Sequence, residues 1–255
     1  MMRRLALAVV LLALPADAGE IPPAARRSDT VTMNPELRAM QADDMANPAS
    51  LWALDGQALW GAGAGSTGKS CADCHADARA SMKGVAARYP AFDATSGRVL
   101  DLEARINQCR VDRQGAAPLA RESRALLNLA TYVGQQSRGA PIRSEDPRLA
   151  PVIERGRQLF SARQGQLNLS CAICHDDNWG RKLGSATIPQ AHPTGYPAYR
   201  LEWQSVGSLQ RRLRNCMVGM RAEPYAFGSD EFTALEAFLM ARAQGLALET
   251  PAVRP

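Results

Sequence analysis

Apolar residues recur at helical spacing in two separate parts of the chain. After Ser123 they stand at offsets +3, +6, +9 and +10, and after Ser229 they stand at the same four offsets. Residues three or four apart lie on one face of an α-helix, so each segment predicts an amphipathic helix with one buried face. A further helix is expected to begin at Asn34, because an asparagine cap followed by Pro35 and Glu36 is typical of a helix N-terminus.

These two segments belong to a longer internal repeat. The matched pairs are GQALW and GRQLF, YPAF and YPAY, and LEARINQC and LQRRLRNC, which begin at residues 56 and 156, 89 and 196, and 102 and 209. The last pair shares leucine, arginine, an aliphatic residue and cysteine at equal offsets. The chain therefore contains two copies of one structural unit, each with a first helix, a loop, a short helix and a final amphipathic helix.

The N-terminus carries the features of an export signal. Arg3 and Arg4 precede the apolar stretch Leu5–Leu14, and small residues at Ala16 and Ala18 fit a cleavage site after Ala18. The first 18 residues are therefore predicted to be a signal peptide that directs the protein to the periplasm. This apolar stretch is too short to span a bilayer and no later one is long enough, so no membrane span is expected.

Composition adds two limits. The 255 residues are 46% hydrophobic, which is enough for one large core or two small ones. The formal net charge of +5 is small and scattered, so nucleic acid is not an expected partner. Most of the positive charge is carried by arginine, which suits anion binding better than lysine does.

Four of the six cysteines lie in two C-x-x-C-H motifs, Cys71–His75 and Cys171–His175, which start 100 residues apart (171 − 71). Two cysteines on one helical turn can bond the two vinyl groups of a haem, and the following histidine can bind its iron. A thioredoxin-like redox pair would not explain the two histidines, and zinc would need four ligands at each metal. We therefore expect two covalently bound haem c groups, held by Cys71, Cys74 and His75 and by Cys171, Cys174 and His175.

Each half of the repeat resembles a cytochrome c domain, in which the first and last helices pack against each other beside the haem. The expected fold class is therefore mainly all-α, with two tandem cytochrome c-like domains and an N-terminal extension. We expect the extension over residues 19–50, the first domain over 51–145 and the second over 146–255. Residues 137–152 are rich in proline, glycine and charge, as a linker between domains is.

The two remaining cysteines, Cys109 and Cys216, occupy equivalent positions of the repeat. A haem iron has a second axial position, which methionine or histidine fills in many cytochromes c. The first half has no histidine besides His75, and Met82 follows that histidine too closely to cross the haem. Cys109 is therefore the expected ligand of the first iron, and the repeat assigns Cys216 to the second.

Other assignments of these two cysteines remain open. The repeat favours Cys216 over the nearby Met217 and Met220 as the second ligand, and His192 is the remaining rival. Cys109 and Cys216 could instead form a disulfide with each other or remain as buried free thiols. If they bind iron, they do so as thiolates, which favour Fe(III) and lower the reduction potential relative to methionine.

A resemblance to the SoxA family is carried by the two motifs together with INQCR at 106–110, SRALLNLATYVGQQSRGAPI from Ser123 and RRLRNCMVGMRAEPYAFGSDEFTALEAFLMAR from Arg211. The resemblance implies a dihaem cytochrome subunit with L-cysteine S-thiosulfotransferase activity. Such an enzyme oxidatively joins thiosulfate to a cysteine of the carrier protein SoxYZ, and two electrons leave. It also implies a heterodimer with SoxX, a small monohaem cytochrome c.

The same resemblance gives roles to individual residues. It implies that Cys216 is the axial ligand of the active haem and a sulfur-carrying residue that can become a persulfide, and that Arg212 is the active-site arginine that binds substrate. It implies that Cys109 is the axial ligand of the first haem, which relays electrons or is structural. Helical spacing places Arg212 and Cys216 on one face, but Arg105 stands in the same relation to Cys109. Both arginines could also pair with haem propionates.

Three other functions are compatible with the sequence. A thiosulfate dehydrogenase, also an exported dihaem protein, would join two thiosulfates into tetrathionate without a carrier. A plain dihaem electron carrier would turn over no sulfur compound. A disulfide-stabilised binding module would contain no haem.

Overall fold

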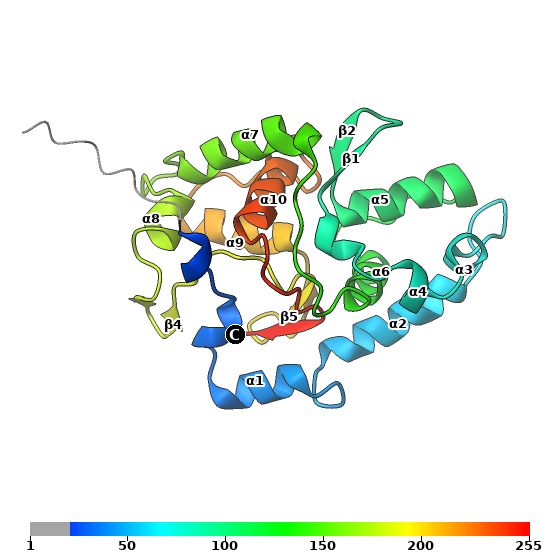
Figure 1. Cartoon of the computed structure of the whole chain (residues 1–255), viewed down its shortest axis with the longest axis horizontal. Helices are drawn as coiled ribbons and strands as arrows, with labels where there is room; N and C mark the ends of the chain where they lie inside the picture. Colours follow the sequence, from blue (N-terminus) through cyan, green and yellow to red (C-terminus); the bar gives the residue numbers. More distant parts are fainter. Residues whose placement is uncertain (1–20) are drawn as a thin grey trace, which may run out of the picture.

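Two crossed helix pairs organise the fold, one in each half of the repeat. The structure is a computed structural model that describes residues 21–255 (Figure 1). Helix α2 (Ala49–Gly61) packs against α6 (Arg124–Gln135), and α7 (Ala150–Ser161) packs against α10 (Asp230–Arg242). These are the first and last helices that the repeat predicts for each half, so the predicted pairing is confirmed.

Serine caps start the last helix of each half where the apolar pattern predicts. The Ser123 side chain accepts a hydrogen bond from the backbone amide of Leu126, and the Ser229 side chain accepts one from that of Phe232. Each cap satisfies a backbone N–H that the start of a helix leaves unpaired. Leu126 and Phe232 are themselves fully buried, so the cap and the first core contact fall within one turn.

A glycine at the centre of each helix pair lets the two backbones touch. A Cβ atom on Gly56 would lie 2.1 Å from the carbonyl oxygen of Asn128, and one on Gly156 would lie 2.0 Å from that of Ala234. Both distances are far below van der Waals contact, so no residue larger than glycine fits either crossing. The repeat therefore extends from the sequence to the geometry of the crossing.

In chain order, the motif helices and the cysteine-bearing helices come between the two members of each pair. In the first half these are α3 (Cys71–His75), α4 (Ala78–Ser81) and α5 (Leu102–Cys109), which continues as the π-helical turn η4 (Arg110–Gln114). In the second half they are α8 (Cys171–His175) and α9 (Leu209–Gly219).

Short hairpins lead into the two cysteine-bearing helices. Strand β1 (Ala91–Asp93) pairs with β2 (Arg98–Leu100), β5 (Ala198–Arg200) pairs with β6 (Ser205–Gly207), and β7 (Ala252–Arg254) adds a parallel strand to β5. The sequence pattern does not predict these strands, because three-residue strands are too short to show alternation. The fold is nevertheless mainly α-helical, as expected. The remaining elements are β3 (Lys182–Leu183), β4 (Ala186–Thr187), η1 (Pro23–Ala25), η2 (Asp29–Thr32), η3 (Ala86–Arg88) and η5 (Pro147–Leu149).

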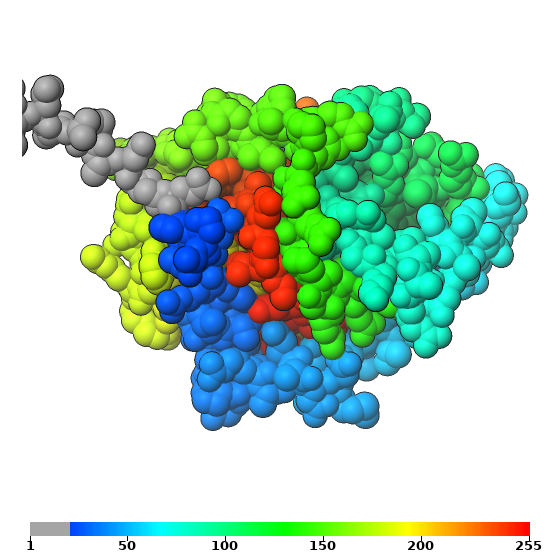
Figure 2. Space-filling view, viewed as in Figure 1, coloured from blue at the N-terminus to red at the C-terminus, as the bar shows by residue number. Residues whose placement is uncertain are grey.

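The C-terminal segment ties the two halves to the N-terminal extension. Residues 139–142 of the linker exchange backbone hydrogen bonds with residues 245–248, and the side chain of Asn47 donates to the carbonyl oxygen of Pro251. Figure 2 shows this segment in red at the surface, between the blue extension and the green linker. The extension is therefore packed into the fold through the chain's last residues.

The extension contains the predicted helix, α1 (Pro35–Ala42). Its start is confirmed, because the Asn34 side chain accepts a hydrogen bond from the amide of Leu37. Leu37 packs in one apolar cluster with Tyr199 and Val253 of the second half. The extension therefore covers the sheet formed by β5, β6 and β7.

Some of the sequence predictions concern features that this structure does not test. The predicted signal peptide, residues 1–18, lies outside the described residues. The domain boundaries at 51–145 and 146–255 remain predictions. Between residues 21 and 255, no helix is long and apolar enough to cross a membrane.

Candidate active site

A buried serine starts each motif helix. The Ser70 hydroxyl accepts a hydrogen bond of 3.1 Å from the amide of Asp73, and the Ser170 hydroxyl accepts one of 3.3 Å from the amide of Ile173. These caps fix the helical turn on which the two cysteines and the following histidine stand. The structure therefore forms each motif as a short helical turn, as the sequence predicts.

Each motif histidine lies against an aromatic ring from the first helix of its half. The ring centroids of Trp60 and His75 are 5.7 Å apart, and those of Phe160 and His175 are 6.3 Å apart. The aromatic residue precedes the histidine by the same number of positions in both halves. The first helix of each half thus supports the back of the histidine.

His175 is prepared to bind a metal through one nitrogen. Its Nδ1 lies 2.7 Å from the carbonyl oxygen of Pro189. Because a carbonyl can only accept, Nδ1 carries the proton and the Nε2 lone pair is free for iron. Burial also lowers the pKa of His175 to about 4, which keeps the ring neutral at physiological pH.

The first cavity has a volume of about 200 Å³ and contains the complete first set of predicted site residues. It is lined by the two cysteines and the histidine of the first motif and by Arg105 and Cys109 of α5. Met82 lines it too, but packs in the cluster that contains Trp60, the ring beside His75. The exclusion of Met82 as a ligand on sequence distance remains a prediction.

The second cavity is larger, with a volume of about 440 Å³. It is lined by His175, Arg212 and Cys216, and His192 lines it as well. Both Cys216 and His192 are thus placed where a second axial ligand could come from. The methionines at 217 and 220 are buried in the apolar core around Phe232 and do not line this cavity.

Each lone cysteine lies close to the attachment cysteines of its own half. Burial, reinforced by the nearby thiol of Cys216, raises the pKa of Cys171 to about 12. Burial also raises the pKa of Cys71, and the thiol of Cys109 adds to that rise. No disulfide joins any of the six cysteines, and Cys109 and Cys216 line different cavities, so the disulfide alternative is wrong.

The zinc alternative also lacks support from the geometry. Across residues 21–255, no group of three or more histidine, cysteine, aspartate or glutamate side chains is arranged to hold a metal ion. A haem iron needs only two axial ligands from the protein. The arrangement of the donors therefore suits haem and not a structural zinc ion.

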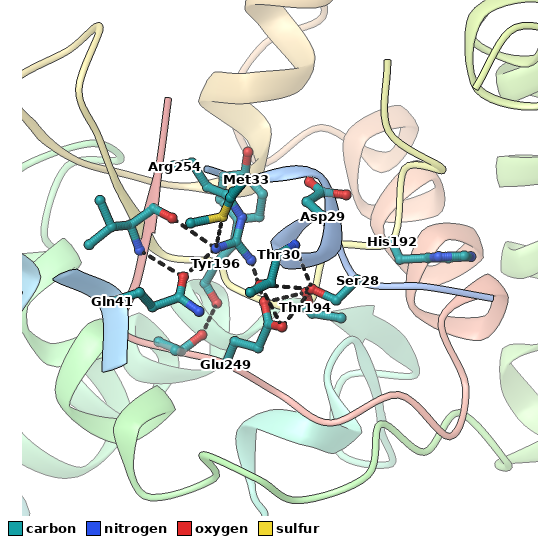
Figure 3. Close-up of polar contacts among 12 residues, drawn as sticks. Ser28, Asp29, Thr30, Met33, Gln41, His192, Thr194, Tyr196, Glu249 and Arg254 are labelled. Carbon is teal, nitrogen blue, oxygen red and sulfur yellow. Dashed lines mark hydrogen bonds and ion pairs between the residues drawn. The ribbon is translucent and has the colours of Figure 1, made fainter. Parts of the chain in front are cut away.

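Residues from two distant segments, among them Asp29 and Arg254, line the second cavity, and a polar network beside them joins the two segments (Figure 3). The Glu249 carboxylate accepts hydrogen bonds from the hydroxyls of Ser28 at 2.5 Å, Thr30 at 2.8 Å and Thr194 at 2.9 Å, and it pairs with Arg254. Burial opposes the negative charge, but Arg254 and the three hydroxyls hold the pKa of Glu249 below its usual value. The sequence shows no sign of this network, since Ser28 and Glu249 are 221 positions apart.

Two buried polar atoms beside this network have no hydrogen-bond partner within the described part of the chain. They are Asp29 Oδ1 and His192 Nε2, and both residues line the second cavity. His192 Nδ1 donates to the carbonyl oxygen of Arg27 at 2.8 Å, and burial lowers the pKa of His192 to about 4. Burial raises the pKa of Asp29 to about 6. Orphaned buried polar atoms are typical of a site that a bound group fills, so this lining fits a haem-binding cavity.

The two repeat-related arginines have different partners. Arg105 donates to Asp93, a buried carboxylate at the end of β1, over 3.0 Å. In the second half the equivalent position, at the end of β5, is Arg200. The position that pairs with Arg105 in the first half therefore carries a cation in the second, and the salt-bridge partner of Arg212 is the exposed Glu202 at 3.5 Å.

This reversal of charge distinguishes the two halves as anion-binding sites. Burial disfavours the charge on Arg212, but its neighbours, Cys216 first among them, raise the pKa of Arg212 above its usual value. Arg200 and Arg212 both line the second cavity. The sequence does contain the signal for this difference: extending the YPAF and YPAY match by one residue aligns Asp93 with Arg200.

Comparison with known proteins follows the same division into halves. A family model described as SoxA/TsdA, cytochrome c domain, matches residues 55–142 and again 155–248. This chain belongs to the SoxA/TsdA family. Membership implies haem c as the cofactor, which agrees with the two C-x-x-C-H motifs and with the cavities beside them.

Relatives within the SoxA/TsdA family resemble this chain over most of its length. The L-cysteine S-thiosulfotransferase subunit SoxA of Pseudaminobacter salicylatoxidans is 41% identical over 222 residues, covering 86% of this chain and 77% of the relative. The same-named subunit of Rhodovulum sulfidophilum is 33% identical over 229 residues, covering 89% and 80%.

A solved structure matches the fold as well. A chain in the crystal structure of SoxXA from P. pantotrophus superimposes with a TM-score of 0.86 at 33% sequence identity. The match covers 89% of this chain and 86% of that chain. The architecture described above, including the helix pairs of both halves, is thus that of a SoxA-type cytochrome.

Proposed function

We propose that this chain is the SoxA-type subunit of an L-cysteine S-thiosulfotransferase, which joins thiosulfate to a cysteine of a SoxYZ-like carrier protein. The observation that carries the proposal is Arg212, a guanidinium on the helix of Cys216 that lines the second cavity and has the exposed Glu202 as its salt-bridge partner at 3.5 Å. A guanidinium can bind a sulfur oxyanion through two parallel hydrogen bonds. The names of the relatives suggest the reaction, and Arg212 offers a place for its anionic substrate.

Two haem c groups are proposed, one for each cavity. The residues that would hold the first haem are Cys71, Cys74, His75 and Cys109, which all line the first cavity. Those that would hold the second are Cys171, Cys174, His175 and Cys216, of which His175 and Cys216 line the second cavity. We prefer Cys216 to His192 because the first cavity places Cys109 at the equivalent position and has no second histidine. When bound, each haem supplies an iron that accepts one electron at a time.

The chain's own residues position the reactants. Arg212 holds the oxyanion end of thiosulfate so that its terminal sulfur lies beside Cys216, which shares a helix face with Arg212. One S–S bond forms between that sulfur and the carrier cysteine, the carrier thiol loses its proton, and two electrons leave. His175, neutral and fixed by the Pro189 carbonyl, would hold the second haem through Nε2.

A SoxX-like monohaem cytochrome c is proposed as the partner and electron acceptor. The solved structure with the same fold is a SoxXA complex, which supports a heterodimer. We also propose that the signal peptide is removed near Ala18 and that the protein works in the periplasm.

The deciding experiment uses purified holo-protein with a SoxX-like partner, a SoxYZ-like carrier, thiosulfate and an electron acceptor. We expect the mass of the carrier to increase by one thiosulfate adduct, in a reaction that requires the carrier. Tetrathionate formed from thiosulfate alone would identify a thiosulfate dehydrogenase instead. A protein that is reduced and oxidised but yields no sulfur product would be a plain electron carrier.

Mass spectrometry and optical spectra test the cofactor assignment on the same sample. Two covalent haems, both low-spin with His/thiolate ligation, are expected. A single haem, or His/Met ligation at both irons, would contradict the assignment of Cys109 and Cys216.

A further inference from the structure

A carboxylate of the chain itself already lies beside the arginine that is proposed to bind the substrate anion. Glu202 Oε1 accepts a hydrogen bond from Arg200 Nε at 2.7 Å and lies 3.5 Å from Arg212 Nη1. We propose that Glu202 is an internal competitor, which thiosulfate must displace from Arg212, and that it thereby sets the affinity for sulfur oxyanions. This inference rests on the proposed role of Arg212 in binding thiosulfate.

The contact between Glu202 and Arg212 is weak enough to be broken by a substrate. The Glu202 side chain is 45% exposed and stands on the turn that joins β5 to β6. The distance of 3.5 Å between Glu202 Oε1 and Arg212 Nη1 is longer than that of a charge-assisted hydrogen bond, which is about 2.7–2.9 Å. A half-exposed ion pair of this length contributes little to stability, so a bidentate oxyanion can replace it at small cost.

The first half shows the contrasting case of a carboxylate that cannot leave. Asp93 is 5% exposed and accepts hydrogen bonds from Arg105 at 3.0 Å, from Ser96 at 2.6 Å and from Gln108 at 3.1 Å. Hydrogen bonds from Ser96 and Gln108, with that of Arg105, hold the pKa of Asp93 well below its usual range. Arg105 is thereby permanently paired, whereas Arg212 is paired only until an anion arrives.

The two distances at Glu202 also indicate which of its contacts opens. Arg200, at 2.7 Å, is 9% exposed, and its guanidinium lies 5.3 Å from the centroid of the Trp203 ring. This fixed, shorter contact keeps Glu202 beside the cavity when the longer one to Arg212 is lost. Glu202 therefore returns to Arg212 after product release, and Arg200 acts as its anchor.

The test removes the carboxylate charge while keeping the shape of the side chain. In Glu202→Gln holo-complex, the KM for thiosulfate should fall about two- to fivefold, the range expected for loss of a weak ion pair, with kcat unchanged. Isothermal titration of thiosulfate into the resting holo-complex should show the same change in Kd. Glu154→Gln removes the same charge from an exposed pair with Arg157 on α7 and should change neither value.

A double-mutant cycle shows whether Glu202 acts through Arg212. In the Arg212→Ala background, Glu202→Gln should leave the KM unchanged. An equal gain in both backgrounds, or no gain beside the wild-type arginine, would overturn the competitor role even if Arg212→Ala alone impairs the enzyme. If Arg212→Ala alone behaved as wild type, the proposed substrate site itself would be wrong, and this inference with it.

Discussion

Replacing Arg212 and Arg105 with alanine, one at a time, should separate substrate binding from folding. The Arg212 side chain is 33% exposed and its ion pair with Glu202 spans 3.5 Å. Its loss should therefore change the free energy of unfolding by less than about 1 kcal/mol. It also removes a charge-assisted contact to thiosulfate worth about 1.5–3 kcal/mol, so kcat/KM should fall about ten- to hundredfold.

Arg105→Ala should show the opposite balance. The buried Asp93 loses its donor at 3.0 Å but keeps the hydrogen bonds from Ser96 and Gln108. An incompletely satisfied buried carboxylate should lower the free energy of unfolding by about 1–3 kcal/mol, which is a loss of several degrees in Tm. The kcat/KM for thiosulfate should change far less than in Arg212→Ala.

The assay compares both variants as holo-proteins with verified haem content. Steady-state rates at low thiosulfate give kcat/KM, and thermal unfolding gives Tm. Arg212→Lys is the informative conservative variant and should recover little activity, because lysine lacks the planar fork of a guanidinium. Equal losses of activity in the two alanine variants, or near-normal turnover in Arg212→Ala, would refute the placement of the active site.

Three further predictions address the first haem, the helix crossings and a buried acid. Cys109→Met should raise the reduction potential of the first haem in a spectroscopic redox titration and leave substantial turnover, because this haem is expected to be remote from the sulfur chemistry. Complete inactivity in a folded dihaem variant would contradict that division of labour between the two haems. In a denaturant titration, Gly156→Ala should lower the free energy of unfolding by about 1–3 kcal/mol or more, because the new Cβ would lie 2.0 Å from a backbone oxygen of α10. Gly61→Ala is the control: open space surrounds its new Cβ, so the free energy of unfolding should stay within about 0.5 kcal/mol of the original value. Burial, followed by repulsion from Asp101, raises the pKa of Glu103 from a usual 4.5 to about 7. Between these two pH values the folded state retains a proton that the unfolded state loses. The free energy of unfolding should therefore decline as the pH rises from about 4.5 to about 7, and stay low above that. In unfolding curves at pH 5 and pH 8, Glu103→Gln should reduce the difference in free energy of unfolding between the two pH values by up to about 3 kcal/mol. An unchanged pH dependence would show that Glu103 is not protonated in the folded state.

The local parts of both sites could be predicted from the sequence. The turn of each C-x-x-C-H motif, the serine caps and the apolar faces of α6 and α10 depend on residues within about one helical turn of each other. The repeat carried this local information further, because equivalence to Cys109 led to Cys216. The structure places both cysteines on the cavities beside their own motifs.

The difference between the two arginines could have been read from the sequence only with the correct register. Asp93 and Arg200 align once the hairpins β1–β2 and β5–β6 are known to be equivalent. A three-residue strand has no periodicity of its own, so the pattern of apolar residues could not supply that register. Spacing alone therefore left Arg105 and Arg212 equivalent.

Only the tertiary structure decided how the second cavity is closed and which arginine is available. Ser28 and Glu249 are 221 positions apart in the chain and are joined by a hydrogen bond. Asp29 and His192, which lie beside this contact, line the second cavity. Electrostatic and hydrogen-bond energies depend on distance in space and on burial, and neither is encoded in the separation of residues along the chain. The sequence determined which groups each half would contain, because those groups are set by short-range spacing and by the repeat. Packing of distant segments against the second half placed Arg212 on a large cavity, with Asp29 in the same lining and the exposed Glu202 as its salt-bridge partner.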